Sequence, residues 1–415
     1  MAARTRLRLD DPAAAGQVAG AIRALVPPPA AITTEVARIV EAVRDDGDVA
    51  LTEFAHRLDG VDGPLRVTGA ELDAAVAALD PELRAALELA IANVGAVARA
   101  GLGSDIDVEL PQGQTVRLRE VPVRRAAVYV PGGRAPYPSS VVMGAVTART
   151  AGVDEVVVCA PGGHPSILAA CALCGVREVY RAGGAHVVAA LAYGTATVPR
   201  VDVVVGPGNT WVQEAKRLVS GSVGIDGFAG PSDVLVLASE GADAALVAID
   251  LLAQAEHGEG SIAVAVTEDA ALLDDIDAHV ADAAETGAAI ALVGVPDAAT
   301  ALALAEALAP EHLELQGAAA EALAPDVRSA GCLFVGSASA TAFGDYVAGS
   351  NHTLPTGGAA RFASGLNVRH FRRRMSEVRI GTAAGALAPA GAAIARADGF
   401  DLHAASMEVR ENGRP

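Results

Sequence analysis

The chain is poor in aromatic and in basic residues. Only 3% of its 415 residues are aromatic, and 31 Lys and Arg stand against 50 Asp and Glu, which gives a formal net charge of −19. A protein that binds nucleic acid needs a positive surface to displace counterions from phosphates, so this charge excludes an electrostatic nucleic-acid binder. We interpret the short basic run at residues 369–374 as a solvated or interface segment.

Cysteine and uninterrupted apolar stretches are also scarce. The 4 cysteines are too few for a disulfide framework in so long a chain. Cys171 and Cys174 have the spacing of a redox or zinc motif, but their surroundings are those of a buried helix, and no second cysteine pair completes a zinc site. Every long apolar stretch is interrupted by a charge, Pro or Gly, and the first residues lack the apolar run of a signal peptide. We therefore expect a cytoplasmic protein without a membrane span.

Hydrophobic residues, by contrast, make up 52% of the chain and follow two different sequence patterns. Residues 33–100 place apolar side chains three and four positions apart, which predicts helices. From about residue 124, short apolar runs alternate with helical stretches, and a second such series begins at residue 232. This alternation predicts an α/β fold with parallel, doubly wound sheets, followed by a mostly helical tail over residues 383–410.

Two glycine-rich loops follow predicted strands, at residues 131–133 and 206–209. Loops at the carboxyl ends of parallel strands, opening into helix N-termini, are where α/β sheets bind ligands, phosphates in particular. Neither loop is a G-x-G-x-x-G fingerprint. Taken singly, each loop is therefore equally compatible with a plain tight turn.

A candidate metal site lies further along the chain. Gln254 and His257 are three residues apart at the end of an amphipathic helix, hence on one face. An amide oxygen and an imidazole can bind zinc, but two ligands do not make a site. Asp345, in the segment FGDYVAGSNHTLP, is a candidate third ligand in a predicted turn. Without further support, a structural role is the better explanation of the Gln254–His257 pair.

A candidate acid/base pair begins a predicted strand. Glu311 and His312 are adjacent in APEHLELQ, and a carboxylate beside an imidazole suits general acid/base chemistry. As an isolated dipeptide, the pair is also compatible with an ordinary surface position. His403 lies near the end of the tail helix, where a histidine by itself carries no signal.

Taken together and in order, these segments resemble the histidinol dehydrogenase family. The resemblance extends from about residue 35 to about residue 405. The strings that carry it are YVPGGRAPYPSSVVM, GPGNTWVQEAKR, AGPSDVLVLA, LLAQAEHG, APEHLELQ, GDYVAGSNHTLPTGG and SGLNV. Coincidence across seven such strings in the same order is negligible.

The resemblance implies a zinc-dependent enzyme of histidine biosynthesis that oxidises L-histidinol, through L-histidinaldehyde, to L-histidine with two NAD. Glu311 and His312 match the acid/base pair of the family. The implied ligands of one Zn²⁺ per subunit are Gln254, His257, Asp345 and His403. The implied substrate contacts are Ser232, Gln254, His257, His312, Asp345, Asp398 and His403. The implied NAD contacts are Tyr129, His186 and Asn209.

The resemblance also implies an intertwined homodimer with shared active sites, in which the tail carrying His403 serves the partner subunit. Two Rossmann-like domains and the tail are then expected. The first domain combines residues 20–128 with 234–361 on the substrate and zinc side, and residues 129–233 form the second, on the NAD side. Residues 362–415 with 1–19 form the extended or helical tail.

The sequence departs from the family at two positions. His186 stands where many relatives carry Gln, and Asp398 stands where relatives usually carry Glu. Aspartate is one methylene shorter, which changes the reach of its contact to the substrate. Two other functions therefore stay open. One is a paralogue that oxidises another polar alcohol, such as a sulfonated diol, and the other is a zinc hydrolase that uses Glu311 as the base on a metal-bound water.

Overall fold

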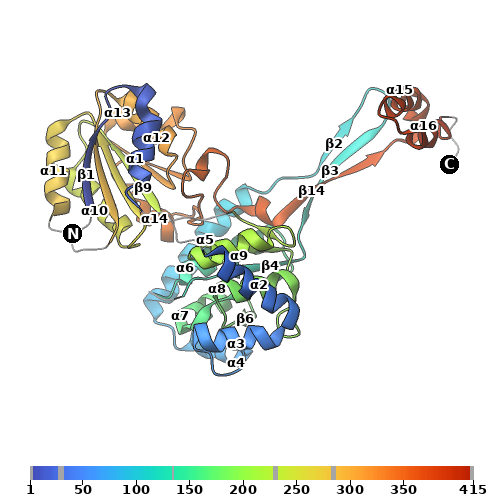
Figure 1. Cartoon of the computed structure of the whole chain (residues 1–415), viewed down its shortest axis with the longest axis horizontal. Coiled ribbons are helices and arrows are strands. Elements are labelled where there is room, and N and C mark those ends of the chain that lie inside the picture. Colours follow the sequence, from blue (N-terminus) through green and yellow to red (C-terminus); the bar gives the residue numbers. More distant parts are fainter. Residues whose placement is uncertain (1–2, 27–31, 133–134, 228–231, 282–286, 412–415) are drawn as a thin grey trace.

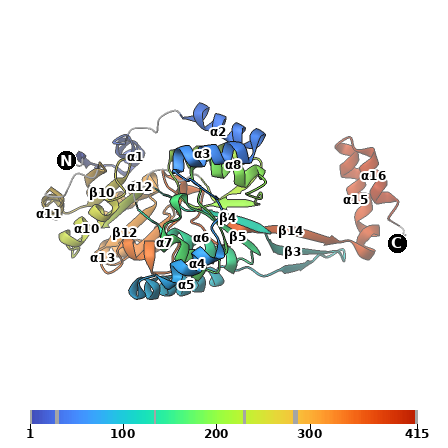
Figure 2. The ribbon, with the colours of Figure 1, turned by 90° about the horizontal axis from the view of Figure 1, so that it is seen from below.

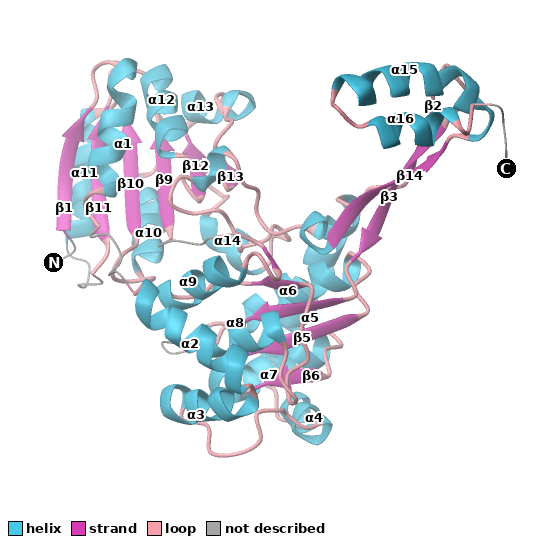
Figure 3. Ribbon diagram, turned by 45° about the vertical axis from the view of Figure 1, so that its right-hand side comes forward, coloured by secondary structure: helices cyan, strands magenta, loops and turns pink. Residues whose placement is uncertain are grey.

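Three sheets organise the chain in the computed structural model shown in Figure 1, which describes residues 3–26, 32–132, 135–227, 232–281 and 287–411. One sheet has six strands, one has five and one has three. The two larger sheets are parallel and carry helices on both faces, as Figure 3 shows. The predicted α/β class with doubly wound sheets is therefore confirmed.

The six-stranded sheet has the order β1-β11-β10-β9-β12-β13. Its strands are β1 (Ala3–Arg8), β9 (Asp233–Ala238), β10 (Ile262–Thr267), β11 (Ala289–Gly294), β12 (His312–Gln316) and β13 (Cys332–Val335). Apolar side chains cover both faces of the central strands, as expected of strands buried on both sides. One face packs on α1 (Ala15–Arg23) and α12 (Ala298–Leu308), and the other on α10 (Ala244–Ala255) and α11 (Ala270–Ala281). Two shorter helices follow β12 and β13, namely α13 (Ala318–Glu321) and α14 (Thr341–Tyr346).

The five-stranded sheet has the order β6-β5-β4-β7-β8. Its strands are β4 (Arg125–Tyr129), β5 (Glu155–Cys159), β6 (Glu178–Tyr180), β7 (Val203–Val205) and β8 (Gly224–Ile225). One face packs on α4 (Gly69–Ala77), α5 (Pro81–Ala100), α6 (Pro138–Thr150) and α7 (Pro165–Leu173). The other face packs on α2 (Thr33–Asp46), α3 (Asp48–Asp59), α8 (Gly184–Tyr193) and α9 (Thr210–Val219).

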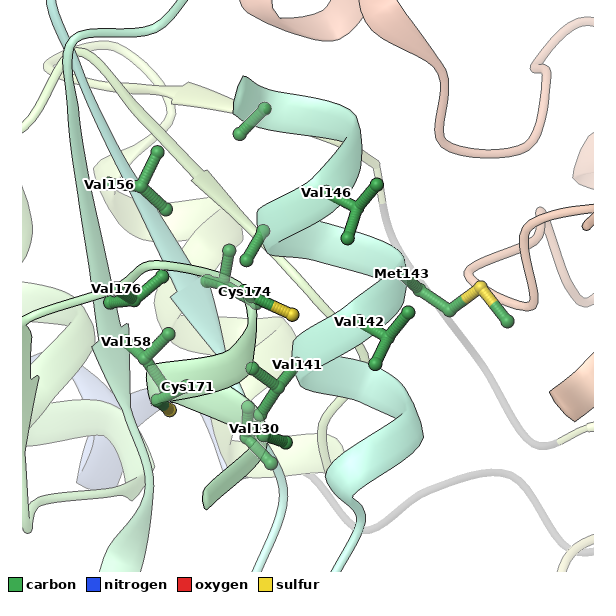
Figure 4. Packing of buried hydrophobic residues seen from close by; sticks show 14 of the residues in the cluster. Val130, Val141, Val142, Met143, Val146, Val156, Val158, Cys171, Cys174 and Val176 are labelled. Atoms are coloured by element: carbon green, nitrogen blue, oxygen red, sulfur yellow. The ribbon is translucent and has the colours of Figure 1, made fainter. Parts of the chain in front are cut away.

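The cysteine pair of α7 belongs to the core of this second sheet. Cys171 and Cys174 are free thiols, both buried, and pack among valines of β5 and α6 (Figure 4). Burial raises the pKa of the Cys174 thiol to about 12, so the thiolate that metal binding or redox chemistry needs does not form at neutral pH. The interpretation of this motif as core packing is confirmed.

The third sheet is an antiparallel arm that projects from the body, as Figures 1 and 2 show. It consists of β2 (Ile106–Glu109), β3 (Thr115–Pro122) and β14 (Arg372–Arg379), in the order β14-β3-β2. The tail helices α15 (Ala384–Ala397) and α16 (Asp401–Glu408) lie at its tip. Large apolar side chains on the arm and its tip are exposed, among them Val378 and Leu402.

The structure differs from the predicted grouping of segments in two places. Residues 3–8, predicted in the tail, form β1, which pairs in parallel with β11 at the edge of the six-stranded sheet. The helices between residues 33 and 100 pack on the five-stranded sheet and not on the zinc side. Apolar periodicity shows which face of a helix is buried but not which sheet buries it, so the sequence alone did not decide these pairings. Among the described helices, none has both the length and the apolarity needed to cross a bilayer.

Candidate functional site

Glu311 and His312 lie at the amino end of β12, in the interior of the six-stranded sheet. Between β12 and its neighbour β9 the order of the strands reverses, because β10 and β11 continue on one side and β13 on the other. Helix α10 leads back from the end of β9 to the start of the parallel strand β10, so its last turn returns to this same edge. The amino ends of β9 and β12 and the last turn of α10 therefore meet at one place.

A chain of hydrogen bonds joins Gln254 to Glu311. The Gln254 Nε2 donates to Ser232 Oγ at 2.7 Å, and Ser232 Oγ donates to Glu311 Oε2 at 2.5 Å. The same carboxylate oxygen accepts the backbone N–H of Asp233 at 3.2 Å, and the Asp233 Oδ1 accepts the backbone N–H of Glu311 at 2.6 Å. Glu311 is only 6% exposed, so these bonds fix the orientation of a carboxyl group that water hardly reaches.

The imidazole of His312 lies between two carboxylates. Its Nδ1 lies 3.9 Å from Glu311 Oε2, and its Nε2 lies 3.5 Å from Asp345 Oδ1. His312 is 3% exposed, and within the described part of the chain neither ring nitrogen makes a hydrogen bond of good geometry. A buried polar atom without a partner is costly, so this ring is suited to exchange a proton with a bound ligand.

The pKa values of these groups follow from burial and from their mutual charges. Burial raises the pKa of Glu311 to about 7, although the positive charge on His312 opposes this. Burial lowers the pKa of His312, but the negative charges of Glu311 and Asp345 outweigh it and raise that pKa to about 9. For Asp345, burial raises the pKa, and the interaction with His312 more than offsets the rise. The site thus contains a carboxyl and an imidazole that both titrate at neutral to mildly alkaline pH, as acid/base catalysis requires.

Three of the four expected zinc ligands lie at this edge. Gln254 is in the last turn of α10 and His257 follows that helix, while Asp345 is in α14 rather than in the turn that the sequence predicts. The charge of His257 contributes to lowering the pKa of Asp345, after the larger effects of His312 and His352. No cluster of three His, Cys, Asp or Glu side chains suited to a metal occurs among the described residues. The predicted set contributes only two such side chains here, because its third ligand is an amide.

The remaining predicted ligand, His403, lies far from the others. It is exposed in α16 at the tip of the arm, with its ring centroid 5.2 Å from that of Phe400. Asp398, between α15 and α16, is exposed at the same tip, well away from α10 and β12 in Figure 1. Within one chain the fold therefore does not bring His403 and Asp398 to the other candidate residues.

The residues expected to contact NAD lie at the carboxyl edge of the five-stranded sheet. Tyr129 ends β4, and its hydroxyl accepts the backbone N–H of Gly184 at 3.2 Å. The Asp59 Oδ2 accepts the backbone N–H of Gly183 at 2.8 Å and lies 3.0 Å from Nε2 of His186. The His186 side chain is 0% exposed, so it is a buried part of this turn rather than a side chain in solvent.

The second glycine-rich loop follows β7 and ends at Asn209. The Asn209 side chain is exposed at the start of α9, where its Oδ1 accepts the backbone N–H of Val212 at 3.2 Å. Gly206 has a φ of 118°, and a Cβ there would lie 2.1 Å from the carbonyl oxygen of Tyr129. Only glycine fits this close approach. The order of the sheet reverses between β4 and β7, the place where α/β sheets bind nucleotides. Of the first loop, residue 133 lies outside the described residues.

Sequence reasoning missed several polar residues that support these sites. His352 links the two sheets, because its Nδ1 lies 3.0 Å from the carbonyl oxygen of Asp345 and its Nε2 lies 3.2 Å from Ser140 Oγ of α6. Asp233 is buried at the start of β9, and the buried Glu314 accepts the N–H of Thr341 at the start of α14 at 2.8 Å. The available signal was a charged or amide residue inside an otherwise apolar strand, which a chain rarely buries without a partner.

Comparisons with known proteins identify a family and a matching fold. A family model described as histidinol dehydrogenase matches residues 28–411. The chain is 45% identical over 400 residues to the histidinol dehydrogenase of Rhizobium meliloti, covering 92% of this chain and 92% of that protein. It is 46% identical over 399 residues to that of Nocardia farcinica, covering 90% and 89%. The crystal structure of histidinol dehydrogenase from Elizabethkingia anophelis matches with a TM-score of 0.90 at 28% identity, covering 99% of this chain and 98% of that chain.

Proposed function

The chain belongs to the histidinol dehydrogenase family, and we propose that it oxidises L-histidinol to L-histidine with two NAD, at a zinc site completed by a second copy of itself. The observation that carries this proposal is the geometry at the start of β12. A buried imidazole, which has no hydrogen-bond partner among the residues that the structure describes, lies beside a carboxyl group that Ser232 holds in place. Such a pair can accept a proton from the alcohol, from the water that adds to the aldehyde, and from the hydrated aldehyde, which are the three proton transfers that a four-electron oxidation of an alcohol needs.

The proposed ligands of the zinc ion are Gln254, His257 and Asp345, with His403 of the partner subunit as the fourth. The donor set fits zinc, because it offers an imidazole, a carboxylate and an amide. The amide nitrogen of Gln254 is engaged by Ser232, which leaves the amide oxygen to face a cation. The carboxyl end of a helix such as α10 also carries a partial negative charge that favours a cation. When bound, zinc holds the polar groups of the substrate and so orients the reacting carbon.

The chemistry of the proton transfers falls to this chain's own side chains. His312 takes the proton of the alcohol in the first oxidation, with its ring held between Glu311 and Asp345. Glu311 deprotonates the water that adds to the aldehyde, and Ser232 holds its carboxyl group by a hydrogen bond throughout. His312 acts again on the hydrated aldehyde. A single enclosed site keeps the reactive aldehyde away from solvent between the two steps.

The proposed NAD site lies at the carboxyl edge of the five-stranded sheet, and NAD bound there would supply the hydride acceptor for each oxidation. Tyr129 and Asn209 flank the point at which the strand order reverses. We propose that His186 acts through the turn at Gly183 and Gly184, because its ring is buried against Asp59. The amino ends of α8 and α9 lie at this edge, and the amino end of a helix favours an anionic diphosphate.

The proposed dimer gives the arm its role. The arm carries exposed apolar side chains far from its own body, as an isolated subunit rarely does. In a two-fold dimer each arm would reach across to the other subunit, where His403 would complete the zinc ligands and Asp398 would contact the substrate. This arrangement explains why the tail residues of the family pattern lie apart from the remainder of the site in one chain.

Removal of the metal tests the proposed function most directly. Zinc-loaded protein is expected to reduce two NAD per histidinol consumed, and chelation is expected to abolish this rate, which added zinc then restores. The measurement is NADH absorbance with and without chelator. If zinc-loaded protein does not oxidise histidinol but does oxidise a sulfonated diol or another polar alcohol, the proposed substrate is wrong and the protein is a paralogue that acts on that alcohol. Release of a hydrolysis product without NADH would instead indicate a zinc hydrolase.

The pH dependence of the first oxidation follows from His312. Only the neutral imidazole can accept the alcohol proton, so kcat/KM for histidinol is expected to rise with pH and then level off. The midpoint should lie at or below about pH 9, because Glu311 and Asp345 raise the pKa of His312 to that value and a cation on Asp345 would reduce the effect. The check is a pH–rate profile of the zinc-loaded enzyme. A rate that falls between pH 6 and pH 8 would contradict the assignment.

A further inference from the structure

Lys216 is a buried ammonium group for which the proposed chemistry has no use. It lies in α9, is 0% exposed, and is among the largest fully buried side chains among the described residues. Its Nζ donates to Asp226 Oδ1 at 2.6 Å, and Asp226, just after β8, has a side chain that is 7% exposed. Taking both charges out of water is expensive, and a buried ion pair often adds nothing to stability compared with apolar side chains of the same size.

Both members of this ion pair bind the backbone of the same residue, Gly206. The Lys216 Nζ donates to the carbonyl oxygen of Gly206 at 2.5 Å, and the backbone N–H of Gly206 donates to Asp226 Oδ2 at 2.6 Å. Hydrogen bonds with one charged partner are roughly twice as strong as neutral ones. The pair therefore holds both polar backbone groups of one glycine with charge-assisted bonds.

Gly206 is the residue at which the chain leaves β7 for the second glycine-rich loop, residues 206–209, which we call the cofactor loop. Its α-carbon packs against the backbone of Tyr129, and its positive φ turns the chain sharply toward Asn209 and α9. The hydrogen bond to Gly208 in the same loop is longer, since Gln213 Nε2 donates to the carbonyl oxygen of Gly208 at 3.3 Å. The backbone conformation of Gly206 thus sets where Asn209 lies relative to Tyr129.

We propose that Lys216 and Asp226 are positioning residues for the cofactor loop. They hold the backbone of Gly206 so that Tyr129 and Asn209 present one fixed site to the cofactor. The proposal rests on the proposed function, because it assigns NAD to that edge of the sheet. The pair acts on cofactor affinity, and it is dispensable for folding when both charges are removed together.

The test is the double variant Lys216→Met with Asp226→Leu, in which two apolar side chains replace the ion pair. Removing both partners avoids the uncompensated buried charge that either single variant would leave. The thermal midpoint is expected to stay within a few degrees of the wild type. KM and the equilibrium Kd for NAD are expected to rise at least tenfold, while KM for histidinol and the zinc content stay within about threefold.

A matched control comes from the opposite end of the same sheet. Arg125 begins β4, is buried, and pairs with Glu155 and Glu178 at 2.6 Å each, far from the cofactor loop. Arg125→Met is expected to lower the thermal midpoint without raising the Kd for NAD. This variant separates a general loss of stability from a loss of loop position.

The outcomes are distinct. Unchanged NAD affinity in the folded double variant would overturn the proposal, and so would an equal loss of NAD affinity in the Arg125→Met control. If the double variant does not fold, the ion pair is required for folding and the dispensability that we propose is wrong. If the wild-type protein itself does not bind NAD, the proposed function fails, and that result is known before any variant is compared.

Discussion

Replacing His312 by Asn is expected to lower kcat for histidinol oxidation by about 10²–10⁴-fold, the usual contribution of a general base. The ring of His312 is the only proton acceptor that we assign to the alcohol, and Asn offers no basic nitrogen in its place. Binding should persist, because the proposed zinc ligands Gln254 and His257 are untouched. The measurements are the steady-state rate of NADH formation and, separately, the zinc content and the Kd for histidinol.

The control for this variant is His279→Asn. His279 is exposed in α11 on the same domain, and its replacement should leave the rate unchanged. If His312→Asn retained wild-type kcat, the assignment of the base would be wrong. If it lost zinc and substrate together with activity, His312 would be part of the binding site, and its role as a base would have to be tested with another variant.

Mixing two inactive variants is expected to restore activity if the tail acts across the dimer. His403→Ala would remove a zinc ligand supplied to the partner, and His312→Asn would remove the base of its own subunit. In a heterodimer one site would then carry both lesions and the other neither. After random exchange of subunits half of the dimers are mixed, so activity should approach about a quarter of the wild-type value per site.

The measurement is the NADH rate of the mixture as a function of time after mixing, with subunit exchange followed independently by differently tagged chains. Each variant alone, treated in the same way, should stay inactive. No recovery despite verified exchange would show that His403 acts within its own chain or not at all. The geometry of the fold argues against the first of these, because α16 lies at the tip of an arm that leads away from β12.

Much of the fold could be predicted from local patterns. Asp80 followed by Pro81 predicts a helix start, and Asp80 does cap α5 by accepting the N–H groups of Glu82 and Leu83. The short apolar runs that alternate with helical stretches predict strands β4 to β7 and β9 to β13 of the two parallel sheets, and the structure confirms these strands. These features depend on neighbours a few residues apart, so the sequence contains the necessary information.

The three-stranded arm could not be predicted in this way. Strand β14 pairs with β3 about 250 residues away, as Arg373 opposite Val121 illustrates, and neither strand has a regular alternation of buried and exposed positions. The edge strand β1 could not be predicted either, because its partner β11 lies far along the chain, with Ala3 opposite Ala289. Strand pairing over such separations depends on which surfaces meet, and a local pattern does not encode that.

The candidate site, like the fold, was determined partly by the sequence and partly by the tertiary structure. The sequence by itself determined the residue types, the spacing of Gln254 and His257 on one helix, the adjacency of Glu311 and His312, and the family to which the chain belongs. Only the tertiary structure decided that these groups meet at the amino edge of a parallel sheet, because strand order reverses between β9 and β12 and α10 returns its last turn there. Only the tertiary structure, too, brought the Lys216–Asp226 pair onto the backbone of Gly206. Contacts between distant segments arise from the packing of whole elements, and that packing is a property of the folded chain.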